Sequence, residues 1–285
     1  MKIAGTGLLP RPGPISWTGG NTTAVILAAG CGSRLGRETR NRPKCLVEVG
    51  GAPLLEYQLQ TLARAGIDDV WVVLGHMADA VRGFVGGRAR YVYNDDWART
   101  NSLYSLSLCS DYIGTRLLVM NGDVLAHPEV THRVLRSQGS AFAIDSSSGG
   151  DQEHMKVELN GGLLASMSKD LPRERTHGEN VGILHFDAHA AWVLFQEAAA
   201  LIRTGGRHLW MAAAVERAAR TISLRGVDVA DLPWIEIDFP EDVRRARQVI
   251  LPRMLSAPRA GAHQRLRRRD RRDVPPLRVA GAPFK

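Results

Sequence analysis

The chain has 285 residues, 44% of them hydrophobic, and a formal net charge of +8. This length fits one large α/β domain or two small ones, and the apolar content is sufficient for a substantial core. No apolar run approaches the roughly 18–20 residues that a membrane helix requires, which argues against a membrane protein. The three cysteines show no zinc-binding spacing, so we expect reduced thiols and a cytoplasmic location.

Most of the positive charge lies at the C-terminus, where residues 256–285 contain nine Lys or Arg and two Asp. Such a segment has too little apolar surface to fold alone. Its only aromatic residue is Phe284, whereas proteins that bind single-stranded nucleic acid place aromatic residues among the basic ones. We therefore predict a flexible leader at 1–21, one domain at 22–253, a disordered basic tail at 254–285, and no nucleic-acid partner.

Short apolar runs alternate with helical patterns in the first half of the chain. The run from Ala24 to Ala29 ends at glycines, as a buried parallel strand does before a tight loop. Further strands are predicted at 70–74, 90–93 and 116–120, and helices at 54–65, 77–85 and 102–109. This alternation predicts an α/β fold: a Rossmann-like three-layer sandwich with a mostly parallel mixed sheet and a glycine-rich phosphate loop after the first strand.

The second half of the chain is predicted to add a hairpin, two strands and further helices. The hairpin turns at Asn160-Gly161-Gly162, a typical turn sequence. Its strands are predicted at 154–159 and 163–167, two more strands at 181–186 and 234–237, and helices at 188–203 and 210–219. A last helix begins at Pro240, with Glu241 and Asp242 beside its positive end.

The glycine-rich segment after the first strand is the first candidate site. Its nucleotide-binding candidates are Leu27, Ala28, Ala29, Gly30, Gly32, Ser33 and Arg34. Small residues let the backbone approach a ligand and point its N–H groups at phosphate. No Gly-Lys-Ser/Thr ends this loop, which excludes a Walker loop, and Leu35 replaces the third glycine of the dinucleotide fingerprint. Arg34 and Lys44 would supply two cations for a leaving pyrophosphate; the alternative is a plain turn with a solvated Arg34.

Three carboxylates follow predicted strands. Asp123 comes directly after the strand at 116–120, where a parallel sheet faces its ligand crevice. Glu236 and Asp238 are two residues apart on one predicted strand, so both side chains project from the same face. Magnesium binds one or two carboxylates together with phosphate oxygens, which makes these residues the candidate metal ligands. The alternatives are a turn aspartate at 123, an exposed glutamate at 236, and a helix cap at 238.

Together these segments resemble the nucleotidyltransferase superfamily of the sugar-nucleotide pyrophosphorylase type, over about residues 22–250. The segments Leu27-Ala-Ala-Gly-x-Gly-x-Arg34, Pro43-Lys44-x-Leu46 and Gly122-Asp123 occur in the family's order. The resemblance implies that Arg34, Lys44 and Asp123 are catalytic, with the two basic residues on the triphosphate. It also implies that Asp123, Glu236 and Asp238 hold Mg²⁺.

A narrower resemblance, to phosphocholine cytidylyltransferases and their phosphonate-using relatives, covers the segment Tyr93-Asn94-x-x-Trp97-x-x-Thr100-Asn101-Ser102-x-Tyr104-Ser105-Leu106. It implies CTP as the donor and places Asn101 and Ser105 in contact with nucleotide or acceptor. The family pattern has a second asparagine where Ser102 stands, which puts the acceptor contacts in doubt. The segment from Trp234 to Asp238 resembles the second metal motif of these enzymes.

The expected reaction is attack of an acceptor phosphate or phosphonate oxygen on the α-phosphorus, with pyrophosphate leaving in line. Because that oxygen is already anionic, no strong general base is needed, and His76 and His127 are assigned ordinary structural roles. The acceptor candidates are Trp97, Tyr104, Lys169 and Glu179. The loop at 169–180 has basic residues and no aromatic one, which favours a small anionic phosphonate or phosphorylated acid over phosphocholine.

Two other functions remain open from the sequence. A sugar-1-phosphate nucleotidyltransferase would use the same chemistry with a different acceptor pocket. A non-catalytic nucleotide-binding module would not require the full set of basic and acidic candidates. A homodimer is compatible with the sequence, which leaves the oligomeric state open.

Overall fold

The computed structural model describes residues 21–148, 150 and 153–256. The predicted leader lies outside the described residues except for Asn21, and the predicted tail lies outside them from residue 257. The last described helix runs to Ser256, past residue 253 where we expected the domain to end. Within this part of the chain, no helix combines the length and apolar character that crossing a bilayer requires.

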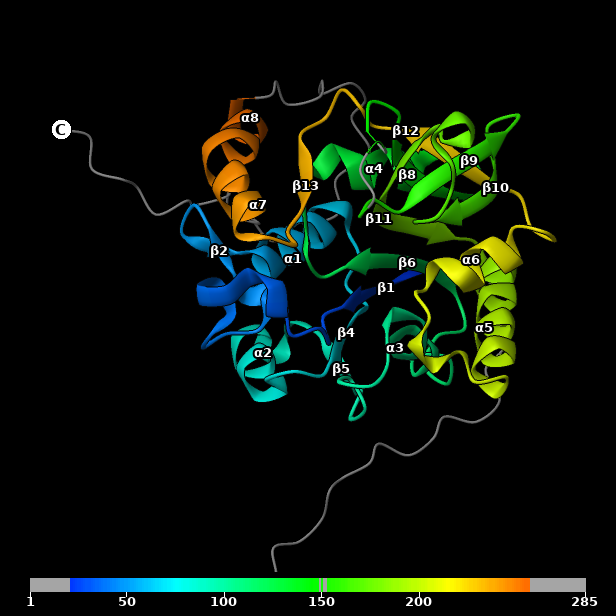
Figure 1. Ribbon diagram of the computed structural model, residues 1–285. Helices are drawn as coiled ribbons and strands as arrows, with labels where there is room; N and C mark the ends of the chain where they lie inside the picture. The colour runs from blue at the N-terminus through cyan, green and yellow to red at the C-terminus, as the bar shows by residue number, and fades with distance from the viewer. Residues whose placement is uncertain (1–20, 149, 151–152, 257–285) are drawn as a thin grey trace, which may run out of the picture.

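A nine-stranded sheet with the order β5-β4-β1-β6-β11-β8-β12-β10-β9 forms the centre of the molecule (Figure 1). Its strands are β1 (Thr22–Leu27), β4 (Val70–Leu74), β5 (Arg90–Tyr93), β6 (Arg116–Asn121), β8 (Ser140–Asp145), β9 (Lys156–Asn160), β10 (Leu163–Ser168), β11 (Gly178–Phe186) and β12 (Leu224–Asp228). β5, β4, β1 and β6 are parallel. β11 runs antiparallel to β6 and β8, β8 and β12 are parallel, and β9 and β10 form the predicted hairpin. The sheet is therefore mixed, and its parallel half consists of strands from the N-terminal part of the chain.

Two layers of helices cover the sheet. The helices are α1 (Leu54–Ala65), α2 (Ala78–Val85), α3 (Ser102–Ser107), α4 (Pro128–Arg136), α5 (Ala188–Arg203), α6 (Ala212–Ala218), α7 (Pro240–Arg245) and α8 (Leu251–Ser256), with a π-helix, Ala246–Ile250, between the last two. One core cluster joins the sheet to α3, α5 and α6, and a second joins it to α1, α2 and α4. Val25 belongs to the first cluster and its neighbours Ala24 and Ile26 to the second, as alternation along a strand requires. This arrangement confirms the predicted three-layer α/β sandwich.

A two-stranded sheet outside the main one brings the end of the domain back to its centre. β13 (Trp234–Glu236) pairs with β7 (Val124–Ala126), and Glu236 lies opposite Val124. Directly beyond this pair, the Ile237 N–H donates to the Asp123 carbonyl at 3.0 Å. The following helices α7 and α8 pack near α1 and β2 (Glu48–Val49), which pairs with β3 (Ala52–Pro53) (Figure 1). The predicted second acidic motif thus lies beside the carboxyl end of β6.

Candidate active site

Two adjoining cavities lie at the carboxyl ends of β1 and β6. We call the first, of about 150 Å³, the neutral cavity, because its own lining includes Asn94, Trp97, Thr100 and Ser105. We call the second, of about 260 Å³, the charged cavity, because its own lining includes Arg34, Lys44, Glu153, Lys169 and Asp238. The two share Gly30, Asn101, Ser102, Asn121, Asp123, Trp210 and Glu236. They form one cleft, at the edge of the sheet where parallel strands bind ligands.

The glycine-rich loop forms one wall of this cleft. Gly30 and Ser33 line the charged cavity together with Gly32, whose φ of 64° is in the left-handed region that favours glycine. Leu27 and Ala29 line the neutral cavity. Ala28 lies behind the loop, because its side chain is buried in the opposite layer and its N–H donates to Val73 at 3.0 Å.

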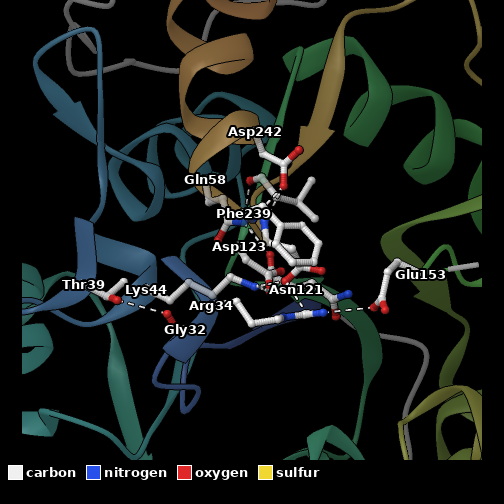
Figure 2. Close-up of polar contacts among 12 residues, drawn as sticks. Gly32, Arg34, Thr39, Lys44, Gln58, Asn121, Asp123, Glu153, Phe239 and Asp242 are labelled. Atoms are coloured by element: carbon white, nitrogen blue, oxygen red, sulfur yellow. Dashed lines mark hydrogen bonds and ion pairs between the residues drawn. The ribbon is translucent and has the colours of Figure 1, made fainter. Parts of the chain in front are cut away.

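Lys44 lies between two of the predicted metal ligands. Its ammonium donates to Oδ2 of Asp123 and to Oδ1 of Asp238, both at 2.6 Å, so three distant segments meet at one nitrogen (Figure 2). The Lys44 side chain is only 13% exposed. The other carboxylate oxygen of Asp123, Oδ1, is buried and has no hydrogen-bond partner.

The electrostatics of this cluster follow from burial and from the opposed charges. Burial lowers the pKa of Lys44, but Asp123 and Asp238 outweigh it and hold that pKa above its usual value. Burial, followed by the nearby carboxylates of Asp123 and Asp238, raises the pKa of Glu236 to about 8. Burial also raises the pKa of Asp238, but Lys44 and Arg34 bring it below its ordinary range. At neutral pH the Glu236 carboxyl is therefore mostly protonated, and Lys44 and Arg34 balance Asp123 and Asp238. A bound metal cation would favour the ionised form of Glu236.

Arg34 lies at the rim of the charged cavity. Its guanidinium contacts Oδ1 of Asp238 at 3.1 Å and Oε2 of Glu153 at 2.9 Å (Figure 2). It also lies over the Phe239 ring, 4.7 Å from the centroid. Because Glu153 also contacts Lys169 at 3.2 Å, a carboxylate bridges two cations at the place where we expected an anionic ligand.

The floor of the neutral cavity is a hydrogen-bonded group of uncharged side chains. Asn94 is 2% exposed, and its amide donates to the hydroxyls of Thr100 and Ser105, both at 3.0 Å. Asn101 caps α3 by accepting the Ser102 N–H at 2.8 Å. The Ser102 hydroxyl in turn accepts the N–H of Met211. The departure from the family pattern at Ser102 therefore holds the segment before α6 in place.

The acceptor candidates do not all reach the same place. Trp97 lines the neutral cavity, and its ring packs edge-on against His76, with centroids 4.8 Å apart. Lys169 lines the charged cavity and lies 5.1 Å from the centroid of the Trp210 ring. Tyr104 does not line either cavity, because its ring packs under the guanidinium of Arg207 at 4.0 Å.

Glu179 belongs to a third cavity, of about 290 Å³, which we call the acidic cavity. It adjoins the charged cavity through Glu153, Glu236 and Asp238, and its lining adds Asp145 and Asp242. Glu179 itself accepts from the Ser148 hydroxyl at 2.5 Å and pairs with His154 at 3.2 Å. The structure therefore separates Glu179 from Trp97 and Lys169.

The sequence analysis missed several residues that line the cleft. Trp210 lines both the neutral and charged cavities although it is 47% exposed, whereas we read it as the start of a helix that in fact begins at Ala212. No sequence signal marked Trp210, because its exposure, which often indicates a binding site for an aromatic side chain, is visible only in the structure. Asn121 and Glu153 had no motif to indicate them. His127 caps α4 by accepting the Glu129 N–H at 3.2 Å, so its role is structural as expected.

Within residues 21–148, 150 and 153–256, no three His, Cys, Asp or Glu side chains lie close enough to hold a metal ion by themselves. Mg²⁺ does not need such a cage, because it keeps waters and uses phosphate oxygens beside one or two carboxylates. The unpartnered buried Oδ1 of Asp123 fits this mode of binding. Cys31, Cys45 and Cys109 are free thiols, so the predicted reduced cysteines agree with the structure.

Comparison with known proteins extends these observations. A family model described as a MobA-like NTP transferase domain matches residues 24–212. The CMP-5'-(3-aminopropyl)phosphonate synthase of Streptomyces rubellomurinus is 30% identical over 78% of this chain and 38% of its own length. The bifunctional IPC transferase and DIPP synthase of Rubrobacter xylanophilus is 32% identical over 80% of this chain and 52% of its own length. The chain thus spans about half, or less, of these curated relatives.

A solved structure supports the same fold. The CTP:phosphocholine cytidylyltransferase of Streptococcus pneumoniae superposes with a TM-score of 0.65, at 23% identity, over 80% of this chain and 99% of that one. At this identity the likeness establishes the α/β architecture.

Proposed function

We propose that this chain, which belongs to the family of MobA-like NTP transferase domains, is a cytidylyltransferase. It would transfer CMP from CTP to a small phosphonate or phosphorylated acceptor and release pyrophosphate. The observation that carries this proposal is the meeting of Arg34 and Lys44 with Asp123, Glu236 and Asp238 in one cavity. Basic side chains and carboxylates are both needed there, because a triphosphate and its metal ion carry opposite charges.

The triphosphate would lie along the charged cavity. Arg34 and Lys44 would contact its phosphates, and the glycine-rich loop at Gly30 and Gly32 would let the backbone approach them. As the bond to the leaving pyrophosphate breaks, the two cations would offset the growing negative charge. The base and ribose would then occupy the neutral cavity, whose floor of uncharged amide and hydroxyl groups suits a neutral ligand.

The names of the relatives support CTP as the donor. Both a CMP-phosphonate synthase and a CTP:phosphocholine cytidylyltransferase resemble this chain. The Ser105 hydroxyl at the floor of the neutral cavity accepts from the Asn94 amide and still has its own proton to donate to a base.

Asp123, Glu236 and Asp238 would hold Mg²⁺, and the carboxylate of Asp123, whose Oδ1 has no hydrogen-bond partner, would be one of its ligands. When bound, the ion would polarise the α-phosphate and offset charge on the reacting oxygens. The protein itself would align the acceptor oxygen with the α-phosphorus, and positioning of this kind contributes much of the rate in phosphoryl transfer. No histidine needs to remove a proton, because the acceptor oxygen is anionic at neutral pH.

The acceptor would enter beside Trp210, which lines both cavities of the cleft. Of the basic residues in the loop at 169–180, Lys169 lines the charged cavity, whereas Arg175 pairs with Glu158 on the surface at 3.0 Å. The adjoining acidic cavity favours an acceptor that carries a positive group at the end away from its phosphorus. We therefore place an aminoalkyl phosphonate ahead of a wholly anionic acid as the acceptor.

The test is pyrophosphate release measured with four nucleoside triphosphates and a panel of acceptors. The panel contains 2-aminoethylphosphonate, phosphocholine, a carboxylated phosphonate and a sugar 1-phosphate. We expect CTP with 2-aminoethylphosphonate to give a kcat/KM at least about tenfold above the other pairs, equivalent to about 1.4 kcal/mol. A preference for the sugar 1-phosphate would replace the proposal with a sugar nucleotidyltransferase. No release with any pair, in protein shown to bind CTP, would favour a nucleotide-binding module.

A further inference from the structure

The position of the Lys44 ammonium carries a consequence for how a metal ion enters the cleft. Its nitrogen lies 2.6 Å from Oδ2 of Asp123 and 2.6 Å from Oδ1 of Asp238, so it fills the point at which these two carboxylates converge. Both side chains are mostly covered, at 21% and 20% exposed. A second cation cannot share that point with the ammonium, because like charges at such a distance repel strongly.

The ammonium also holds the site together in the absence of any ligand. Asp123 and Asp238 come from segments that are 115 residues apart in sequence, and Glu236 places a third carboxyl group near them. If Lys44 were removed, these carboxylates would lose their main counter-charge, which is costly for partly buried ions. Arg34 cannot replace it, since it contacts Asp238 from the rim at 3.1 Å and its side chain is 41% exposed.

The stem of Lys44 is fixed, whereas its end can move. A Cβ atom at Gly32 would lie 3.0 Å from both Cβ and Cγ of Lys44, so the glycine-rich loop packs closely on the base of the lysine side chain. Beyond Cγ the side chain has further rotatable bonds, and Lys44 lines the charged cavity. An anion bound in that cavity therefore offers the ammonium a second partner within reach of a rotation.

We propose that Lys44 is a placeholder cation, which occupies the metal position between Asp123 and Asp238 until a triphosphate draws its ammonium away. The metal ion then enters together with the nucleotide, and it binds weakly when the nucleotide is absent. This inference rests on the proposed function for the identity of the anion. It goes beyond that function, because it assigns Lys44 a role before any chemistry takes place.

The experiment uses the full chain and Mn²⁺ as the probe, with free and bound ion counted by electron paramagnetic resonance. For the wild-type protein we expect weak binding of Mn²⁺ alone. Binding should be at least about tenfold tighter when a non-hydrolysable CTP analogue is present, because its triphosphate would draw the Lys44 ammonium away from the carboxylates and so couple the two ligands favourably. The tighter binding is judged against the affinity of Mn²⁺ for the analogue alone. Tight binding of Mn²⁺ to the wild-type protein without nucleotide would overturn the proposal.

The decisive variant is Lys44→Met, which keeps the length of the stem and removes the charge. We expect it to bind Mn²⁺ without nucleotide at least about tenfold more tightly than the wild type, since the ion no longer competes with the ammonium. The matched control is Arg34→Met, which also removes one positive charge beside Asp238 but leaves the ammonium between the carboxylates. It should raise the Mn²⁺ affinity by less than about threefold, as expected for a rim charge. Equal effects of the two variants would show that the loss of one positive charge, wherever it lies, raises the Mn²⁺ affinity, and this result would overturn the proposal.

Folding is checked by melting each variant with and without Mn²⁺. If Lys44→Met does not fold without metal, Lys44→Gln takes its place, and Mn²⁺ should then raise its melting temperature more than that of the wild type. A smaller or equal rise would contradict the proposal. Because the readout is metal binding, it stands even if the chain transfers no nucleotide. The failure of the proposed function and the failure of this inference are therefore distinguishable.

Discussion

The two ends of the cleft are built in different ways. At the charged end, Lys44, Asp123 and Asp238 come from three distant parts of the chain and are joined by ion pairs of 2.6 Å. At the neutral end, Asn94, Thr100 and Ser105 belong to one short segment and are joined by hydrogen bonds of 3.0 Å. The charged end depends on the whole fold to bring its groups together, whereas the neutral end is largely local.

This difference predicts how each end responds to change. Removing one member of a desolvated ion cluster leaves its partners uncompensated, so the cost is large. Removing one uncharged group from the hydrogen-bonded floor leaves only neutral partners unsatisfied, which costs about 1–3 kcal/mol and less than an uncompensated charge. We therefore expect substitutions at the charged end to change turnover and those at the neutral end to change binding.

The largest effect is expected for Asp123→Ala. This change removes a carboxylate assigned to Mg²⁺, which is also one of the two partners of Lys44, so turnover should fall by ~10²-fold or more, as for other lost charge clamps. The measurement is pyrophosphate release at saturating Mg²⁺. The control is Asp231→Ala, which removes an exposed aspartate paired with Arg133 at 2.6 Å and should keep activity. Near-wild-type turnover of Asp123→Ala would remove Asp123 from the metal site.

A smaller loss is expected for Lys44→Arg. The charge is kept, but a planar guanidinium cannot fill the point between two carboxylates as a compact ammonium does. We expect kcat to be ~10-fold below the wild type and above that of Lys44→Ala, since only part of the leaving-group stabilisation is retained. Full activity in both variants would show that the lysine serves only the structure.

The Asn94→Ala variant tests the neutral end. It removes the donor to the Thr100 and Ser105 hydroxyls, so KM for the nucleotide should rise ~10-fold while kcat changes little, as expected for about one or two lost hydrogen bonds. The control is Ser107→Ala on α3, the helix that carries Ser105; the Ser107 hydroxyl donates to the Tyr104 carbonyl at 2.7 Å. A fall in kcat at unchanged KM would break the distinction between the two ends.

The same difference explains how much the sequence could predict. Individual residues of the charged end were predicted, because glycine loops and carboxylates after strands have recognisable patterns. The contact of Lys44 with both carboxylates could not be predicted, since it depends on the pairing of β7 with β13. The packing of Tyr104 under Arg207, outside the lining of the neutral and charged cavities, could not be predicted, because Arg207 is remote in the sequence.

The fold was predictable where the periodicity is strong. The predicted strand and helix at 70–74 and 54–65 agree with β4 and α1. The elements β2, β3, β7, β8, α4 and β12 were missed. β12, Leu224–Asp228, is short, mixes polar and apolar residues and contains a glycine, so its pairing with β8 rather than its local preference makes it a strand.

The smallest effect concerns stability and lies outside both ends of the cleft. His185 on β11 is 6% exposed, and its Nδ1 atom is buried without a partner. Burial, helped by the positive charge of Arg116, lowers the pKa of His185, although a backbone hydrogen bond at Gly139 and the charge of Asp187 oppose this. Below about pH 6.5 the unfolded chain therefore binds a proton that the folded protein excludes, and stability is lost as the pH falls further.

Replacing His185 with Leu should reduce this loss. The fall in melting temperature between pH 7.5 and pH 5.5, measured without metal or nucleotide, should be smaller in His185→Leu than in the wild type. An exposed histidine provides the control, because His208→Gln leaves the buried ring in place and should keep the wild-type difference. If His185→Leu keeps the full acid loss, the buried histidine is not its source. Glu236 cannot be the source either, because its pKa is raised to about 8 and protonation of that carboxyl adds stability as the pH falls from 7.5 to 5.5.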